Sequence, residues 1–429
     1  MDSNTTLSTQ TQAEKENGAK VHRLAGILAI ILFAYEYAQM VLLNNLYEIL
    51  STSFSLDKLE MGYLSMSYYL GMLIMYPTVG WSVHRYAPAK VLCISLLGVI
   101  LGALAFALSG SFEQLIISRF VQGIFAAFTY VSCLLVATSS YPKSMHAMIT
   151  GYVFAAGALG GSLSQILGQV AIASLGWRHA MYANIIVGFL LTLPYIIYCI
   201  RLRDKPVNNS QESIFSLMKK ALEDIRVWCC AGIAAPLNIS LVAMGAIYGS
   251  TYLQHVHALG PEQAASICGL LYVGVIAGSV FWGKLSWYMK TEIYAIFAGS
   301  MGAILALISL TTERQVPINN LGVYFIIIGV FCSAQAQVYP YIARLLPKMI
   351  IGAAKATIVM GVIGAATMLP WALTHVHTWI QVLQGASVTT ELTSIILPGL
   401  IMINLLGGVC AIKLAQNQTS DNYTKESLA

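Results

Sequence analysis

Long apolar stretches dominate the chain, and short polar segments separate them. Most stretches reach about 20 residues or more, which is the length that an α-helix needs to cross the hydrocarbon core of a bilayer. A membrane β-barrel would instead show segments of about ten residues that alternate between apolar and polar. The pattern predicts twelve membrane-spanning helices, with the approximate limits 24–50, 59–83, 89–109, 113–138, 145–174, 179–200, 227–254, 263–285, 291–310, 319–343, 349–373 and 393–414.

Composition supports a polytopic α-helical membrane protein. Hydrophobic residues make up 57% of the 429 residues and charged residues only 10%, whereas a soluble domain is about 25% charged. The eight cysteines lie in or beside apolar stretches without metal-ligand spacing, so we interpret them as small buried residues and expect no metal site. The basic residues form no stripe with interleaved aromatic residues, which argues against a nucleic-acid partner.

The positions of lysine and arginine orient the chain in the lipid bilayer. Cytoplasmic loops carry an excess of these residues, and 19 of the 23 become cytoplasmic when both termini are placed in the cytoplasm. We therefore expect a multi-pass protein of a bacterial-type inner (plasma) membrane with both termini cytoplasmic. The predicted divisions are a tail at 1–23, a six-helix bundle at 24–200, a central cytoplasmic loop at 201–226, a second six-helix bundle at 227–414 and a tail at 415–429.

The two predicted bundles repeat each other in sequence. The segment "GIFAAFTY" that starts at Gly123 matches "GVFCSAQA" that starts at Gly329, and Gly80 after the second span corresponds to Gly283 after the eighth. The offsets of 206 and 203 residues are nearly equal, so order and spacing are kept. A parallel six-plus-six repeat is typical of many secondary transporters.

With this repeat, the chain resembles the major facilitator superfamily. "SRFVQG", which ends at Gly123, is similar to the R-F-x-Q-G element of the family in span four. The loop after span two reads "GWSVHRYAPAK" where the family carries G-x-x-x-D-R-x-G-x-R-R, and a histidine replaces the acid that helps to latch the cytoplasmic side. The predicted gating motif consists of Gly80, His84, Arg85 and Lys90. The resemblance implies alternating access by a monomer.

Two further segments indicate a branch of that family. "FAYEYAQM" and "LGWRHAMYAN" are similar to metabolite importers of the phagosomal nutrient transporter (Pht) group, from bacteria that live inside host cells. Span five contains glycines but lacks the Gly-Pro dipeptide of the drug-antiporter branch, which weighs against drug export.

A carboxylate, Glu36, lies near the centre of the first span. An ionisable group in mid-bilayer costs about 2.5–3.5 kcal/mol and therefore usually faces a bundle interior or a water-filled cavity. Glu36 shares a helix face with Gln39, which makes that face polar. A carboxylate in such a site can load and unload a proton or bind a substrate ammonium group. The alternative is a helix-packing hydrogen bond or a buried ion pair.

Arg119 is a second charge within a predicted span, and Gln122 follows it by three residues. Arginine stays protonated, so Arg119 cannot carry the proton but can tune a nearby acid or bind a carboxylate. The resemblance implies a coupling role, and contact between Arg119 and Glu36 is a hypothesis. The alternative is that Arg119 extends to the outer membrane interface.

Uncharged polar residues within the spans supply further candidates for a substrate cavity. Amides and tyrosines of this kind suit a small polar solute, although each one is equally able to hydrogen-bond between helices. The candidates are Tyr35, Gln39, Gln165, Asn238, Tyr248, Gln335, Gln337 and Tyr341.

The sequence predicts a carrier and no enzyme. It contains no nucleotide-binding, zinc-protease or esterase motif, which also argues against a primary pump, and we expect no cofactor. The predicted function is proton-coupled uptake of a small polar metabolite, with an amino acid first and nucleosides or other nutrients next. The alternatives are an exporter or siderophore carrier, because the fold fixes neither direction nor cargo, and a non-transporting receptor, which the short loops disfavour.

Overall fold

Helices joined by short turns make up the part of the chain that the computed structural model describes. The described residues are 3–139, 141–201, 213–247, 249–312, 318–384 and 398–414. For some of them, chiefly 3–20 and 369–384, the backbone is described but not the side chain. These ranges contain no β-strand.

The helices of the first half cover the first predicted bundle. They are α1 (Ser3–Val41), α2 (Leu43–Phe54), α3 (Lys58–Arg85), α4 (Pro88–Ala107), α5 (Phe112–Ser139), the 3₁₀ turn η1 (Lys143–Met145), α6 (His146–Leu175) and α7 (Trp177–Arg201).

The second half begins with a short helix in the central loop and continues through the second bundle. Its helices are α8 (Ile214–Glu223), α9 (Ile225–Val242), the π-helical turn η2 (Ala243–Ile247), α10 (Gly249–Val256), α11 (Pro261–Met289), α12 (Ile293–Thr312), α13 (Ile318–Cys332), the 3₁₀ segment η3 (Ser333–Gln337), α14 (Val338–Leu345), α15 (Ile351–Gln384) and the helix Pro398–Leu414.

The predicted all-helical membrane fold is confirmed. Within the described residues, ten segments are long and apolar enough to cross a membrane. The two remaining predicted spans also form helices: the second is α3, whose 28 residues include more polar positions, and the twelfth is the shorter apolar helix Pro398–Leu414.

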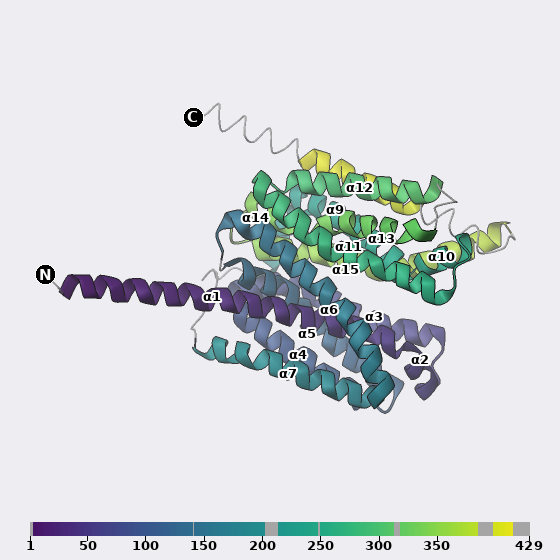
Figure 1. Ribbon diagram of the computed structural model, residues 1–429, viewed down its shortest axis with the longest axis horizontal. Coiled ribbons are helices and arrows are strands. Elements are labelled where there is room, and N and C mark those ends of the chain that lie inside the picture. Colours follow the sequence, from purple (N-terminus) through teal and green to yellow (C-terminus); the bar gives the residue numbers. More distant parts are fainter. Residues whose placement is uncertain are drawn as a thin grey trace.

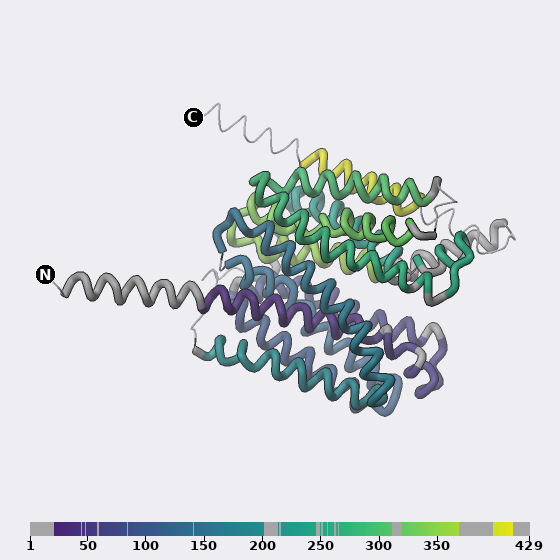
Figure 2. The backbone as a smooth tube through the Cα atoms, viewed as in Figure 1, coloured from purple at the N-terminus to yellow at the C-terminus, as the bar shows by residue number. Residues whose placement is uncertain are grey.

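The helices form two bundles that lie side by side (Figure 1). Helices α1 to α7 form one bundle, and α9 to α15 form the other. The helix that ends at Leu414 points toward the end of the molecule at which α1 enters its bundle (Figure 2). We call this end, which carries Arg85, Lys143, Arg344 and Lys348, the basic end. The charge distribution predicts that it faces the cytoplasm.

Glycines allow the two bundles to meet closely near the basic end. The bundles contact each other mainly through α3 with α15 and through α6 with α11. A Cβ atom added to Gly80 would lie 2.4 Å from the Cα atom of Ala353, and one added to Gly151 would lie 2.3 Å from the carbonyl oxygen of Ser279. Gly283, the repeat equivalent of Gly80, packs on the start of α6 in the same way. The two bundles therefore touch along these two helix pairs near the basic end.

The substitution Gly80→Val should open this contact. The added side chain overlaps backbone that cannot move aside, and overpacking of this kind costs about 1–3 kcal/mol. The matched control is Gly62→Val in the same helix, because a Cβ atom there has no neighbour within 4 Å. Spin labels at positions 90 and 290 would report the separation of the bundles. We expect longer distances for Gly80→Val only, and unchanged distances in that variant would contradict the packing role.

Three predicted spans are interrupted helices, a feature that the hydropathy pattern did not predict. The first span breaks at Leu42, the seventh contains η2, and the tenth contains η3. Pro340 follows η3 closely, and a proline lacks the N–H group and clashes with the carbonyl group four residues earlier, here that of Ala336 within η3. The proline thus explains the break in the tenth span.

Arginine side chains bind carbonyl groups at the C-terminal ends of neighbouring helices. The last four carbonyl groups of a helix have no partner within the helix, and the negative end of the helix dipole attracts a cation. Three such pairs lie at a helix end or within two residues beyond it, outside the membrane centre: Arg178 with Ser109 at 3.1 Å, Arg226 with Leu345 at 3.4 Å and Arg344 with Lys290 at 2.8 Å.

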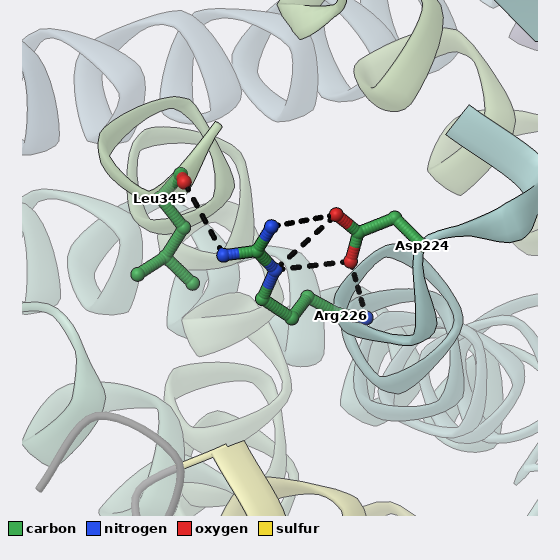
Figure 3. Close-up of polar contacts among 3 residues, drawn as sticks. All are labelled: Asp224, Arg226 and Leu345. Carbon is green, nitrogen blue, oxygen red and sulfur yellow. Dashed lines mark hydrogen bonds and ion pairs between the residues drawn. The ribbon is translucent and has the colours of Figure 1, made fainter. Parts of the chain in front are cut away.

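Asp224 orients one of these arginines and also caps α9 (Figure 3). Its Oδ1 atom accepts a hydrogen bond from the backbone N–H of Arg226 at 2.9 Å, and its Oδ2 atom lies 2.7 Å from Nη2 of that guanidinium. Hydrogen bonds from Arg226 hold the pKa of Asp224 below its usual value. This group joins the start of α9 to the end of α14.

The substitution Asp224→Ala should lower the free energy of unfolding by about 1 kcal/mol, the usual cost of losing a helix cap. A lowered pKa stabilises the fold above the unfolded value and loses that contribution as the pH falls through the folded value. The difference between wild type and variant should therefore shrink as the pH falls below about 4. Thermal unfolding at neutral and acidic pH measures it. Asp224→Ser, which keeps a cap, should lose less, and equal losses would contradict the capping role.

Candidate functional site

Glu36 lies in the interior of the first bundle. Its side chain is only 3% exposed, and its Oε1 atom accepts a hydrogen bond of 2.6 Å from the Tyr68 hydroxyl on α3. The carboxylate thus lies buried between α1 and α3, and the donor that bonds it most closely, the Tyr68 hydroxyl, is uncharged.

Arg119 on α5 is 5% exposed and lies close to Glu36 without pairing with it. Among the described residues no ion pair joins the two side chains, so the hypothesis of direct contact is wrong for this structure. The guanidinium lies over the Tyr68 ring, 4.5 Å from its centroid, and Nη1 donates to Oε1 of Gln122 at 2.9 Å. Tyr68 therefore separates the two charges and contacts both.

The break in the first span explains what Arg119 binds instead. Its Nη1 atom donates to the carbonyl oxygen of Gln39 and its Nη2 atom to that of Met40, each at 3.3 Å. Both carbonyl groups belong to the last turn of α1, which ends at Val41, where intrahelical partners are missing. Arg119 therefore caps α1 in the way the surface arginines cap their neighbours, and its charge is stabilised without a carboxylate.

Gln39 extends the network to α7. Its Nε2 atom donates to the Tyr35 hydroxyl at 2.5 Å and to Oδ1 of Asn184. The Tyr35 hydroxyl donates in turn to the Asn184 carbonyl oxygen at 3.3 Å. A cavity of about 10 Å³ lies against Gln39, Arg119 and Gln122, which is close to the space that one water molecule needs.

Five predicted residues thus come together in one buried network across α1, α5 and their neighbours. They are Glu36, Arg119, Gln122, Tyr35 and Gln39. Sequence reasoning missed Tyr68 and Asn184 as members. Asn184 lies within the "LGWRHAMYAN" segment, whose family resemblance was a usable signal, whereas nothing in the sequence distinguishes Tyr68 from its neighbour Tyr69.

The substitution Tyr68→Phe tests the link between the two charges. Phenylalanine keeps the ring beneath Arg119 but removes the hydrogen bond to Glu36, and bonds to charged groups contribute about 1.5–3 kcal/mol. If Glu36 couples transport to protons, as the sequence predicts, such transport should fall about tenfold or more in Tyr68→Phe, with little change in unfolding temperature. Tyr68→Leu, which also removes the ring, should lower stability as well. Full transport by Tyr68→Phe would show that this hydrogen bond is dispensable.

Three predicted residues of the second bundle form a separate group in η3 and α14. Gln335, Gln337 and Tyr341 are all buried, and Gln337 is 0% exposed. Neither amide atom of Gln337 has a hydrogen-bond partner, and Nε2 of Gln335 and the hydroxyl of Tyr341 also lack one. Buried polar groups without partners are costly. Because η3 also contacts α6 of the other bundle, these groups are candidates for binding a polar ligand between the bundles.

The remaining predicted residues are placed less centrally. Gln165 on α6 and Asn238 on α9 are half-buried, and the structure does not join their side chains to the Glu36 network. Tyr248 lies outside the described residues. In the predicted gating motif, Gly80 packs on Ala353, and Arg85 and Lys90 are exposed. The structure describes the backbone of His84 but not its side chain.

Comparison with known proteins identifies the architecture. The family model described as Major Facilitator Superfamily matches residues 28–375. Among solved structures, the proton:xylose symporter XylE bound to 6-bromo-6-deoxy-D-glucose aligns with a TM-score of 0.70 at 14% identity, covering 93% of this chain and 95% of that one. FucP in the outward conformation aligns with a TM-score of 0.69 at 14% identity, covering 91% and 98%. At this identity the likeness shows the fold alone.

Curated relatives match over shorter regions. "Probable transport protein HsrA" of Haemophilus influenzae is 26% identical over 167 residues, which cover 39% of this chain and 36% of the relative. "Putative multidrug resistance protein MdtD" of Salmonella typhimurium is 26% identical over 172 residues, which cover 38% and 37%. The chain thus spans little more than a third of the length of the curated relatives it matches.

Proposed function

The chain belongs to the major facilitator superfamily, and on this premise we propose that it is a proton-coupled carrier that takes up a small polar metabolite by alternating access. The observation that carries this proposal is the buried carboxylate of Glu36, which accepts a hydrogen bond from Tyr68 and forms no ion pair with any residue that the structure describes. A buried acid of this kind can alternate between its protonated and ionised forms.

The position of Arg119 supports a proton-carrying role for Glu36. A direct ion pair would hold the carboxylate in its charged form throughout the cycle. Here the guanidinium binds the carbonyl groups of Gln39 and Met40 instead, so protonation of Glu36 leaves no unpaired cation behind. The break at Leu42 also gives α1 a point at which the network can respond to that protonation.

The polar groups that lack partners support the proposed class of substrate. The amides of Gln335 and Gln337 and the hydroxyl of Tyr341 can donate to and accept from hydroxyl, amide or carboxyl groups. These groups suit an amino acid first, with nucleosides and other nutrients next. Because XylE is a proton:xylose symporter, monosaccharides are further candidates.

Export is the second candidate function. The similarity to the multidrug resistance protein, which covers 38% of this chain, favours export. Symport and antiport respond in opposite ways to a pH gradient: a symporter concentrates its substrate in the alkaline compartment, and an antiporter in the acidic one. The sign of the gradient therefore separates the two functions whichever way the protein inserts into liposomes.

The test uses purified protein in liposomes and a mixed pool of amino acids, nucleosides, organic acids and monosaccharides. The lumen is analysed by mass spectrometry with acid outside and then with acid inside. We expect at least one compound to accumulate with acid outside, and a protonophore to abolish the accumulation. Accumulation only with acid inside would establish antiport instead, and accumulation under neither gradient would contradict proton coupling.

A further inference from the structure

A large cavity opens at the basic end, away from the Glu36 network. Its volume is about 920 Å³, which is in the range of small-molecule binding sites. The basic residues that line it are His22, Lys143, His146, Arg344, Lys348 and Lys355. No acidic side chain lines the cavity in the part of the chain that the structure describes.

The cations come from both bundles. In the first bundle, Lys143 lies just before α6 and His146 is its first residue. Lys348 and Lys355 belong to the second bundle. The charge of Arg344 is balanced by Glu292, at 2.7 Å. Within the described residues no ion pair balances Lys143, Lys348 or Lys355 in this way. Like charges that face each other across an interface oppose its closure.

Helix ends add to the positive potential of the cavity. His146 and Ile351 are the first residues of α6 and α15, and both line the cavity. The N-terminus of a helix carries a partial positive charge and free N–H groups, which favour anions. One helix of each bundle therefore presents its positive end to the same space.

Lys355 is the second, independent observation that points to a ligand. Its side chain is only 4% exposed and lines the cavity. No hydrogen bond or ion pair of its ammonium group is found among the described residues. A buried charge without a partner is strongly unfavourable, so a negative group in the cavity would supply the interaction that the protein does not.

We propose that this cavity binds a small oxyanion with more than one negative charge, through phosphate or carboxylate groups, between Lys355 of one bundle and Lys143 of the other. The bound anion neutralises the cations that the two bundles bring together at the basic end and so stabilises this conformation. The site is distinct from Glu36 and does not depend on which metabolite is carried. Its test accordingly measures binding and not transport.

Thermal unfolding of the purified protein in phosphatidylcholine nanodiscs provides the first readout, with inorganic phosphate or citrate as probe and sodium chloride to hold ionic strength constant. We expect the unfolding temperature to rise by about 3 °C or more in wild type. Lys355→Met and Lys348→Met should lose this rise, and Lys355→Arg should keep it. Lys90→Met, an exposed lysine that does not line the cavity, is the matched control and should behave as wild type.

Repeating the measurement in a second lipid composition distinguishes a site for free anions from a site for a lipid headgroup. Nanodiscs that contain phosphatidylglycerol offer the same phosphate chemistry from the lipid. A site for free anions gives the same rise in both membranes, whereas a headgroup site is already filled and gives no rise with the anionic lipid. No rise in either membrane, or an equal rise in Lys355→Met, would overturn the proposal.

Discussion

Glu36→Gln should abolish proton-driven accumulation of the substrate while preserving its exchange across the membrane. Glutamine keeps the size of the side chain and still accepts the Tyr68 hydrogen bond, but it cannot bind and release a proton. A gradient of one pH unit supports about tenfold accumulation for one proton per substrate. The variant should therefore equilibrate the substrate without concentrating it, measured as the ratio of internal to external substrate in liposomes.

The control for this prediction is Glu113→Gln, which removes an exposed carboxylate from the start of α5. It should accumulate substrate as the wild type does. Accumulation by Glu36→Gln would show that the proton binds elsewhere. Loss of both accumulation and exchange would instead indicate that Glu36 binds the substrate or holds the helices together, the two alternative roles of a carboxylate in this position.

Arg119→Ala should eliminate exchange as well as accumulation. The change removes the donors to the carbonyl groups of Gln39 and Met40 and leaves Gln122 without its partner. Each hydrogen bond to a charged group contributes about 1.5–3 kcal/mol. The end of α1 beside the break at Leu42 therefore loses the hydrogen bonds that stabilise it. We expect the exchange rate to fall about 100-fold or more and the unfolding temperature to drop.

Arg119→Lys separates charge from geometry. A lysine ammonium is a compact charge and cannot reproduce the fork that binds two carbonyl groups and an amide at once. The variant should therefore remain at least about tenfold slower than wild type. Arg178→Lys is the matched control, because that arginine binds a single carbonyl group at the end of α4. Full exchange by Arg119→Lys would contradict the capping role of the guanidinium.

Much of the architecture is readable from the sequence because it depends on hydropathy and repetition. Apolar stretches of membrane-spanning length predict the helices, and the nearly equal offsets between matching segments predict two related bundles. The correspondence between Gly80 and Gly283 is matched in the structure, where each glycine packs its helix against the other bundle. Buried charges are similarly informative, since the cost of placing Glu36 and Arg119 in a span predicts an interior position for both.

Other features depend on contacts between segments that are distant in sequence. The break at Leu42 lies within an apolar run. It leaves the carbonyl groups of Gln39 and Met40 without partners in the helix, and Arg119, 79 residues away from Met40, binds both. The role of Tyr68 follows from its position between two charges on different helices. Neither property is encoded in the local pattern of polar and apolar residues, so hydropathy could not predict them.

Proton movement driven by the substrate is the most direct test of coupling through Glu36. Liposomes with a trapped pH-sensitive dye and no initial pH gradient would receive the accumulated compound from outside, with a potassium ionophore to prevent charge build-up. We predict that the lumen acidifies with wild type and stays constant with Glu36→Gln, while both take up the compound. Uptake by wild type without acidification, or acidification that persists in Glu36→Gln, would contradict the proposed mechanism.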